Sequence, residues 1–399
     1  MRGIGDRVAA YRKRRGLSQA ALAGLVGRSE SWLSQVERGV RGVDSLSVIR
    51  ELSQQLHVSP DTLIGTNFES FAADADHRAA DPVRHYLDRY TQLLTAPQVT
   101  EQTSQELSAA AEAANHSYQD AAYDDALRAI AELLPNVDDL VRGRADDPDA
   151  IHAYVAAYVV SAKVLHKVGR TGWPRSRRIA RPSWPARPRT AGADRGLAAR
   201  ETVLALLYTG RPDAAEALAI DMATSLEAYP DHDDPVLLSL RGSLLLLAAV
   251  IAARRAERYE ALDRLAQAEQ LADQLGYDGN HGWTAFGPTN VAIHAVSIAA
   301  ELGDAGEAVR LSHRIDAANL PPGLTSRRAQ LHLDLAWAYV QQRRDAEAIL
   351  QILEAEQIAP QLVQYHPVIR QSVRDILSRS RTGSTGVLHD LAVRVGILS

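Results

Sequence analysis

Apolar positions recur at intervals of three and four residues along most of this chain, which is the spacing of helices with one buried face. From about residue 105 onward, alanine dominates the apolar positions, little alternates as a strand does, and breaks fall at Gly, Asp and Pro. The pattern predicts an all-α fold. Its breaks divide the chain into a head (1–65), a linker with one helix (66–104), a helical array (105–362) and C-terminal capping helices (363–399).

Residues 16–39 of the head form the most informative segment, because they indicate two short helices joined by a tight turn. Ser18 and Ser29 stand where a side-chain oxygen caps a helix, and Gly27 stands at the turn, where a positive φ costs glycine least. An apolar stripe is expected to pack the two helices together: Leu22, Ala23, Val26, Leu33 and Val36. The second helix then presents a polar, hydrogen-bonding face, which suits the major groove of DNA.

This segment resembles the helix-turn-helix of the phage-repressor-like (Xre) family of DNA-binding proteins. The residues that match the family in order are Arg12 to Arg15, Leu17 to Gln19, Leu22, Ala23, Gly27, Ser29, Leu33, Ser34, Glu37 and Gly39. The resemblance covers about the first 65 residues and implies a five-helix domain. After Gly39 the chain reads Val40-Arg41-Gly42-Val43-Asp44, where the family usually has a basic residue and a proline. That departure puts the phosphate contacts of the loop in doubt.

The resemblance also implies a role for each residue of the polar face. Base edges are reached from the start of the second helix and one turn further, at Ser29, Glu30, Ser31 and Gln35. Gln35 can pair with adenine, whereas Glu30 either accepts from cytosine or repels the phosphates. The candidates for clamping the DNA backbone are Arg28, Arg38 and Arg41.

Three further residues of the head have alternative or internal roles. Gln19 is expected either to contact a phosphate or to brace the second helix. Trp32 is expected either to lie against the sugar-phosphate backbone or to wedge half-buried against the fourth helix. Arg12 and Glu37 are expected to pair internally, as their equivalents in the family do.

Charge separates the head from the rest of the chain. Residues 1–65 hold ten basic and six acidic side chains, a net charge of +4, and since the whole chain carries −5, the remainder carries −9. A cationic head on an acidic body suits a nucleic-acid reader, although a chance fluctuation of composition would look the same.

The composition also limits the classes of function. The chain has no cysteine, no N-terminal hydrophobic signal and no long apolar run, so we expect a cytoplasmic protein without disulfides or membrane segments. Motifs for metalloprotease, nucleotide, nucleophile-elbow and dinucleotide chemistry are absent from the sequence, and its histidines are scattered. We therefore expect no enzyme, no catalytic residues, no cofactor and no metal.

Five turn-then-helix phrases recur along the array. Their equivalent alanines are Ala126, Ala217, Ala261, Ala308 and Ala348, and the gaps after Ala217 are 44, 47 and 40 residues. A period near 40 with two helices per unit predicts an α-solenoid, with a generic helical bundle as the alternative. The last unit resembles the tetratricopeptide repeat at Ala336, Tyr339, Ala348, Ile352, Ala355 and Pro360.

The gap between Ala126 and Ala217 is about twice the period, so one repeat is expected between them. Its second helix would fall near residues 172–190, where the chain instead holds Pro-rich and Arg-rich sequence without an acidic residue. Three interpretations of the irregular segment 172–192 remain open. It is a basic loop that touches DNA, an insertion without a role, or a helix altered by a local frameshift.

One aromatic loop interrupts the array at residues 281–290 and leads into the first helix of a repeat. First helices line the concave face of tetratricopeptide arrays, so a ligand groove is expected here, lined by Phe286, Asn290, Ile293, Gln330, Trp337 and Gln341. The alternative is a long loop packed only for stability.

Head and array together resemble bacterial regulators with an Xre-type head and a tetratricopeptide sensor, including the peptide-sensing regulators abbreviated RRNPP. The resemblance implies a transcriptional regulator that binds a palindromic operator in double-stranded DNA as a homodimer. It also implies that a peptide or small-molecule effector shifts the dimer between two shapes. The alternative is a DNA-anchored scaffold whose repeats bind a partner protein without a small-ligand switch.

Overall fold

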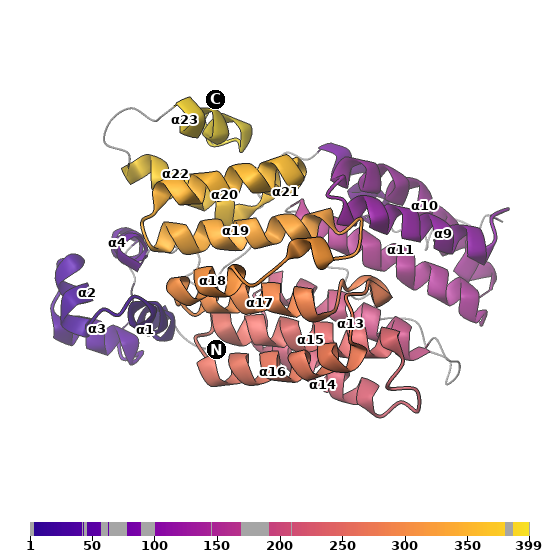
Figure 1. Cartoon of the computed structure of the whole chain (residues 1–399), viewed down its shortest axis with the longest axis horizontal. Coiled ribbons are helices and arrows are strands. Elements are labelled where there is room, and N and C mark those ends of the chain that lie inside the picture. The colour runs from indigo at the N-terminus through magenta and orange to yellow at the C-terminus, as the bar shows by residue number, and fades with distance from the viewer. Residues whose placement is uncertain are drawn as a thin grey trace.

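The chain is all-α, as its periodicity predicts (Figure 1). The computed structural model describes residues 4–41, 43, 46–56, 63, 78–88, 100–144, 146–168, 191–208, 210–379 and 386–398, and these residues contain no strand. The head lies at one side of the array, with α2 and α3 farther from the array than α1 and α4 (Figure 1).

The head contains four described helices: α1 (Ile4–Arg14), α2 (Gln19–Leu25), α3 (Glu30–Glu37) and α4 (Leu46–Leu56). One apolar core joins them, and its buried members are Val8, Leu22, Ala23, Val26, Leu33, Leu52, Leu56 and Leu63. All five stripe residues predicted between the two helices of the motif are buried. The expected fifth helix falls, apart from Leu63, outside the described residues.

Local signals in the sequence place α2 and α3 correctly. The Ser18 hydroxyl accepts from the amide of Ala21 at 3.0 Å, and the Ser29 hydroxyl accepts from the amide of Trp32 at 3.2 Å. Gly27 has a φ of +63°, as the turn requires. Both predicted caps and the predicted turn are therefore confirmed.

The array is built from helical hairpins, whose first and second helices alternate along the chain. After η1 (Arg78–Ala80) and α7 (Asp81–Asp88) come the pairs α9 (Ser104–Gln119) and α10 (Tyr123–Gly143), α13 (Ala191–Tyr208) and α14 (Pro212–Glu227), α15 (Pro235–Arg254) and α16 (Arg258–Leu275), α17 (Pro288–Glu301) and α18 (Ala305–Ser312), and α19 (Thr325–Gln341) and α20 (Asp345–Ile358). Two short helices lie in loops: η2 (His281–Trp283) and η3 (Ala317–Asn319).

Each of the five recurring phrases lies at the start of the second helix of a hairpin. The turn before each second helix contains one residue with a positive φ, always two positions ahead of the helix: Ala121, Gly210, Ala256, Gly303 and Arg343, with φ between 58° and 82°. The repeat is therefore visible in the backbone as well as in the sequence.

The remaining first helix, α11 (Pro148–Lys167), is followed by residues 169–190, which lie outside the described residues. The three interpretations of the segment 172–192 rest on those residues, apart from the first two of α13. The chain ends in α21 (Pro360–Tyr365), α22 (Pro367–Arg379) and α23 (Gly386–Arg394).

The two ends of the array meet. Gln119, the last residue of α9, also contacts the middle of the array, since it forms a reciprocal amide pair with Asn280 before η2, with two hydrogen bonds of 2.9 Å. The Gln361 side chain accepts from the amide of Tyr123 at 2.8 Å. One continuous apolar core also joins buried residues of α7 and α9 to α11 with buried residues of α19 to α23. The first hairpin thus packs against the last elements.

Helix α15 is the most apolar helix of the array. By length and composition alone it is apolar enough to cross a membrane, but 78% of its 18-residue apolar window is buried inside the fold. Gly242 in its middle allows the ring of Phe286 to approach, since a Cβ there would lie 2.0 Å from the ring. These features are those of a core helix.

Candidate nucleic-acid interface

Helix α3 divides into a buried side and an exposed side. Leu33 and Val36 are fully buried, whereas Ser29, Glu30 and Ser31 at the start of the helix are exposed. Trp32, Ser34 and Gln35 are half-buried. The predicted base-reading residues are thus accessible, on a helix that lies farther from the array than α1 and α4 do (Figure 1).

A buried ion pair fixes α3 to α1. The Arg12 guanidinium donates to both carboxylate oxygens of Glu37, at 2.6 and 2.8 Å, and also to the carbonyl of Leu17 at 2.8 Å. The residues are 8% and 9% exposed. The internal pairing expected for Arg12 and Glu37 is therefore confirmed, and its two-pronged geometry restricts the rotation of α3 as well as its position.

Gln19 joins this pair from α2. Its side-chain amide donates to Glu37 at 2.7 Å, which corresponds to the bracing alternative of its two predicted roles. Burial alone would raise the pKa of Glu37, but hydrogen bonds from Arg12 and Gln19 outweigh it and lower that pKa. The hydrogen bond to Glu37 in turn raises the pKa of Arg12. Both groups are therefore charged near neutral pH.

The predicted backbone clamps lie at the two ends of α3. Arg28 precedes the helix and lies over the Trp32 ring, with 5.7 Å between the guanidinium carbon and the ring centroid. Arg38 follows the helix and donates to the carbonyl of Ser34 at 3.2 Å. Arg28, Arg38 and Arg41 are exposed, and Trp32 packs partly on the core of the head. Cations thus flank the polar face at both ends.

The predicted ligand groove in the array is less accessible than the sequence implies. Phe286, Asn290 and Ile293 are buried, and Phe286 packs on Gly242 in the core. Gln330 donates to Asp334 at 2.9 Å, and Gln341 donates to the carbonyl of Ala300 at 3.2 Å. The sixth residue, Trp337, is half-buried against an apolar cluster. A groove at these residues stays a prediction.

Sequence interpretation overlooked a group of cations inside the array. Lys163 and Lys167 stand one helical turn apart on α11, in an otherwise apolar stretch. Only three of the 44 Lys and Arg residues of the chain are lysines, so two lysines at this spacing in an apolar helix were a usable signal. Among the described residues, no three His, Asp or Glu side chains are grouped as metal ligands.

Comparison with known proteins agrees with the geometry of the head. Residues 4–63 match the model of a helix-turn-helix domain. Over 67 residues the chain is 36% identical to the HTH-type transcriptional regulator SinR of Bacillus subtilis (strain 168), and to SinR of Bacillus licheniformis. Each match covers 17% of this chain and 60% of the relative, so the chain spans less than two thirds of their length. No solved structure matches.

Proposed function

We propose that this protein is a sequence-specific, DNA-binding transcriptional regulator that acts in the cytoplasm. The observation that carries the proposal is the capped helix α3, which is held by the buried Arg12–Glu37 pair with Ser31 and Gln35 on its accessible face. Hydrogen-bonding side chains on such a face read base edges in the major groove, and flanking arginines contact phosphates. The similarity of the head to SinR regulators supports the same role.

The test is a footprint of the full-length protein on DNA upstream of its own gene, beside a Ser31→Ala/Gln35→Ala double variant. Both substitutions leave the core of the head intact, because neither residue is a buried member of it. An exposed glutamine on α16, changed as Gln270→Ala, serves as the control. Protection of an inverted repeat that the double variant loses supports a dimer on a two-fold operator. Equal protection by the double variant contradicts base reading by α3.

We further propose that the array dimerises the protein and senses a peptide or small molecule, at a site such as the predicted groove. The support is architectural: the hairpins enclose polar groups, and both ends of the array are joined, so a ligand inside would contact several helices at once. Such a ligand changes DNA affinity only if it binds two shapes of the protein unequally. Gel-shift titration with and without ligand measures that difference.

The second candidate is a DNA-anchored scaffold whose array binds another protein. Exposed apolar side chains on α16, Tyr259 and Leu262, favour it, because large apolar groups in solvent are typical of contact surfaces. Stable co-purification of one protein, lost in a Tyr259→Ser/Leu262→Ser variant, would support the scaffold over the sensor.

A further inference from the structure

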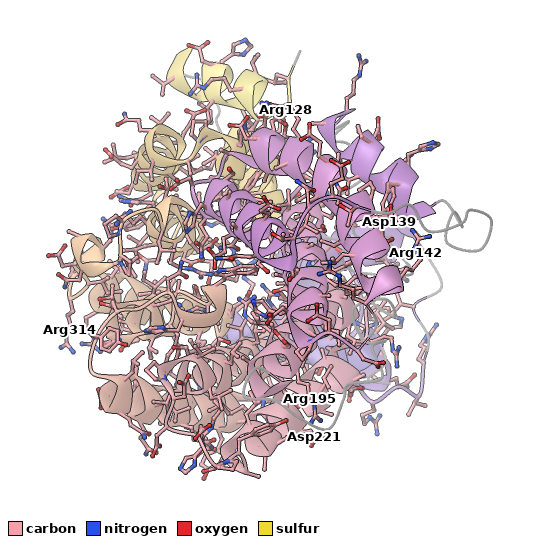
Figure 2. All side chains as sticks on the ribbon, turned by 90° about the vertical axis from the view of Figure 1, so that its right-hand side faces the viewer. Arg128, Asp139, Arg142, Arg195, Asp221 and Arg314 are labelled. Carbon is pink, nitrogen blue, oxygen red and sulfur yellow. The ribbon has the colours of Figure 1, made fainter. Side chains whose placement is uncertain are left out.

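Four cations from three helices converge inside the array: Lys163 and Lys167 of α11, Arg200 of α13 and Arg327 of α19. We call them the lysine–arginine cluster. Arg200 pairs with Glu201 at 2.6 Å, and Glu201 lies 4.0 Å from His166, the neighbour of Lys167, so α11 and α13 meet here. Arg200 and Arg327 also lower the pKa of both lysines, and Arg200 lowers that of Arg327. Figure 2 shows the molecule from the side on which α9, α10 and α11 lie, with the side chains as sticks.

The carboxylates near the lysine–arginine cluster do not neutralise its positive charge. Glu201 is buried and pairs with Arg200 at 2.6 Å. Asp334 accepts from Ser297 and from Gln330, and burial raises its pKa to about 6. Fully protonated, the cluster therefore sets four cations against two carboxylates. Like charges held close together in a partly dry interior destabilise a fold unless something pairs with them.

Nearby histidines contribute hydrogen-bonding groups without charge. Burial and neighbouring cations lower the pKa of His166 to about 4 and the pKa of His294 to about 3. Burial, with Lys167 and Arg254 nearby, lowers the pKa of His366 to about 3. All three are neutral near neutral pH, so they neither add to the excess charge nor compensate for it.

Several donors of the cluster have no partner among the residues that the structure describes. Among the described residues, Lys167 and Arg327 donate no side-chain hydrogen bond and form no ion pair, although both are half-buried. Lys163 donates only to neutral oxygens, Asn115 Oδ1 at 3.3 Å and the carbonyl of Trp283 at 3.0 Å. Within the same described part of the chain, the Nδ2 atom of fully buried Asn115 has no acceptor. Residues 169–190, which follow Lys167, contain no Asp or Glu.

We propose that the lysine–arginine cluster binds a small anion that carries two or more carboxylate or phosphate groups. Arginine forks and lysine ammonium groups are the side chains that recognise these oxyanions, and partial burial strengthens each contact. This inference rests on the proposal that the array senses an effector, and it names the effector's chemical class. Because α11, α13 and α19 each supply a cation, the anion would tie three helices of the array together.

Without an anion, Lys163 and Lys167 are only partly protonated near neutral pH. Burial, reinforced by Arg200 and Arg327, lowers the pKa of Lys163 to about 7 and that of Lys167 to about 8. An anion favours the charged lysines and raises both pKa values, so binding takes up protons. At about pH 7.5 the expected uptake is up to about one proton per chain.

The experiment is isothermal titration calorimetry of the full-length protein with citrate, pyrophosphate and inorganic phosphate, at constant ionic strength. Citrate carries only carboxylates and pyrophosphate only phosphates. Comparing the two therefore shows which of these groups the site prefers. We expect citrate or pyrophosphate, each with two or more such groups, to bind once per chain, with proton uptake seen as a difference in heat between Pipes and Tris buffers. A Lys167→Gln/Arg327→Gln variant should lose at least about tenfold in affinity. Arg310→Gln, at an exposed site on α18, should bind as the unmodified chain does.

Two results would overturn the inference: no binding of citrate or pyrophosphate at millimolar concentration, or equal binding by the double variant. The melting temperature of the double variant serves as the control for misfolding. It should not fall, because the variant removes two charges that repel their neighbours. Gel shifts with operator DNA separate the two proposals. Anion binding that leaves DNA affinity unchanged supports the site and refutes sensing, whereas DNA binding without anion binding refutes only the site.

Discussion

The ion pair between Arg12 and Glu37 gives the most quantitative prediction for the head. Its side chains are 10% and 6% exposed, so solvent screens the pair little. Removing one partner, as in Glu37→Leu, leaves the other charge buried without compensation, and this costs about 3–5 kcal/mol. Removing both, in Arg12→Met/Glu37→Leu, leaves only neutral groups without partners, at Leu17 and Gln19, and costs about 1–3 kcal/mol. The double variant should therefore be more stable than the Glu37→Leu single variant.

Hydrogen exchange followed by mass spectrometry on the full-length protein measures this effect locally. The free energy of opening is read from peptides that cover α1 to α3, with peptides of α15 as an internal reference. We expect the double-variant cycle to give a coupling energy of at least about 2 kcal/mol. If the stability loss of the double variant equalled the sum of the losses of the two single variants, the argument that burial makes the two charges interdependent would be refuted.

Acid provides a second test of the same pair. The pKa of Glu37 is lower in the folded head than in the unfolded chain. The ionised carboxylate therefore contributes fully to the stability of the head above the unfolded pKa, about 4.3. The contribution is lost as the pH falls through the folded value. Opening of the unmodified head should therefore become easier below about pH 4, and the Arg12→Met/Glu37→Leu variant should lack this component. Equal acid sensitivity in both would contradict the assignment.

Three glycine and alanine changes test close approaches and strained turns in the rest of the fold. Gly5→Ala should cost about 1–3 kcal/mol and weaken DNA binding, because its Cβ would lie 1.8 Å from the carbonyl oxygen of Val36 on α3. Gly242→Ala should destabilise the array by about 1–3 kcal/mol, because the fully buried ring of Phe286 has nowhere to move. Ala256→Gly should stabilise the array by about 0.5–1 kcal/mol, since its φ is +58°. Urea unfolding and hydrogen exchange measure all three.

Each change has a matched control. A Cβ at Gly24 on α2 or at Gly306 on α18 meets no atom within 4 Å, so alanine at these positions should be tolerated. In the opposite direction, Ala266→Gly on the exposed side of α16 should cost about 0.5–1 kcal/mol, because its backbone is helical. If Ala256→Gly destabilised as much as Ala266→Gly, positive φ would not be the cause.

Sequence alone predicted the features that depend on neighbouring residues. The caps at Ser18 and Ser29 and the turn at Gly27 each involve residues no more than a few positions apart, and the structure confirms them. The second helices of the hairpins were also found, because a turn and an alanine recur at fixed positions. Resemblance to a family supplied the pairing of Arg12 with Glu37, which local patterns do not show.

The contacts between distant parts of the array were beyond sequence reasoning. Gln119 and Asn280 are 161 positions apart, and their contact depends on the rotation accumulated over several hairpins. The sequence pattern predicts Phe286 in a ligand groove because its loop leads into a first helix and first helices line the concave face of such arrays. In the structure its ring fills the place left open by Gly242. A glycine in the middle of an apolar helix is a signal for such an approach, but it does not say which side chain arrives.

The joined ends of the array have a mechanical consequence. An open stack of repeats frays from its termini, since each terminal unit has only one neighbour. Here the first hairpin also rests on the last elements, through Gln361 and the shared apolar core, so no unit is terminal in that sense. A closed circuit of this kind should unfold in one cooperative step. It should also tolerate moving the chain ends to another turn by circular permutation better than it tolerates deletion of any single hairpin.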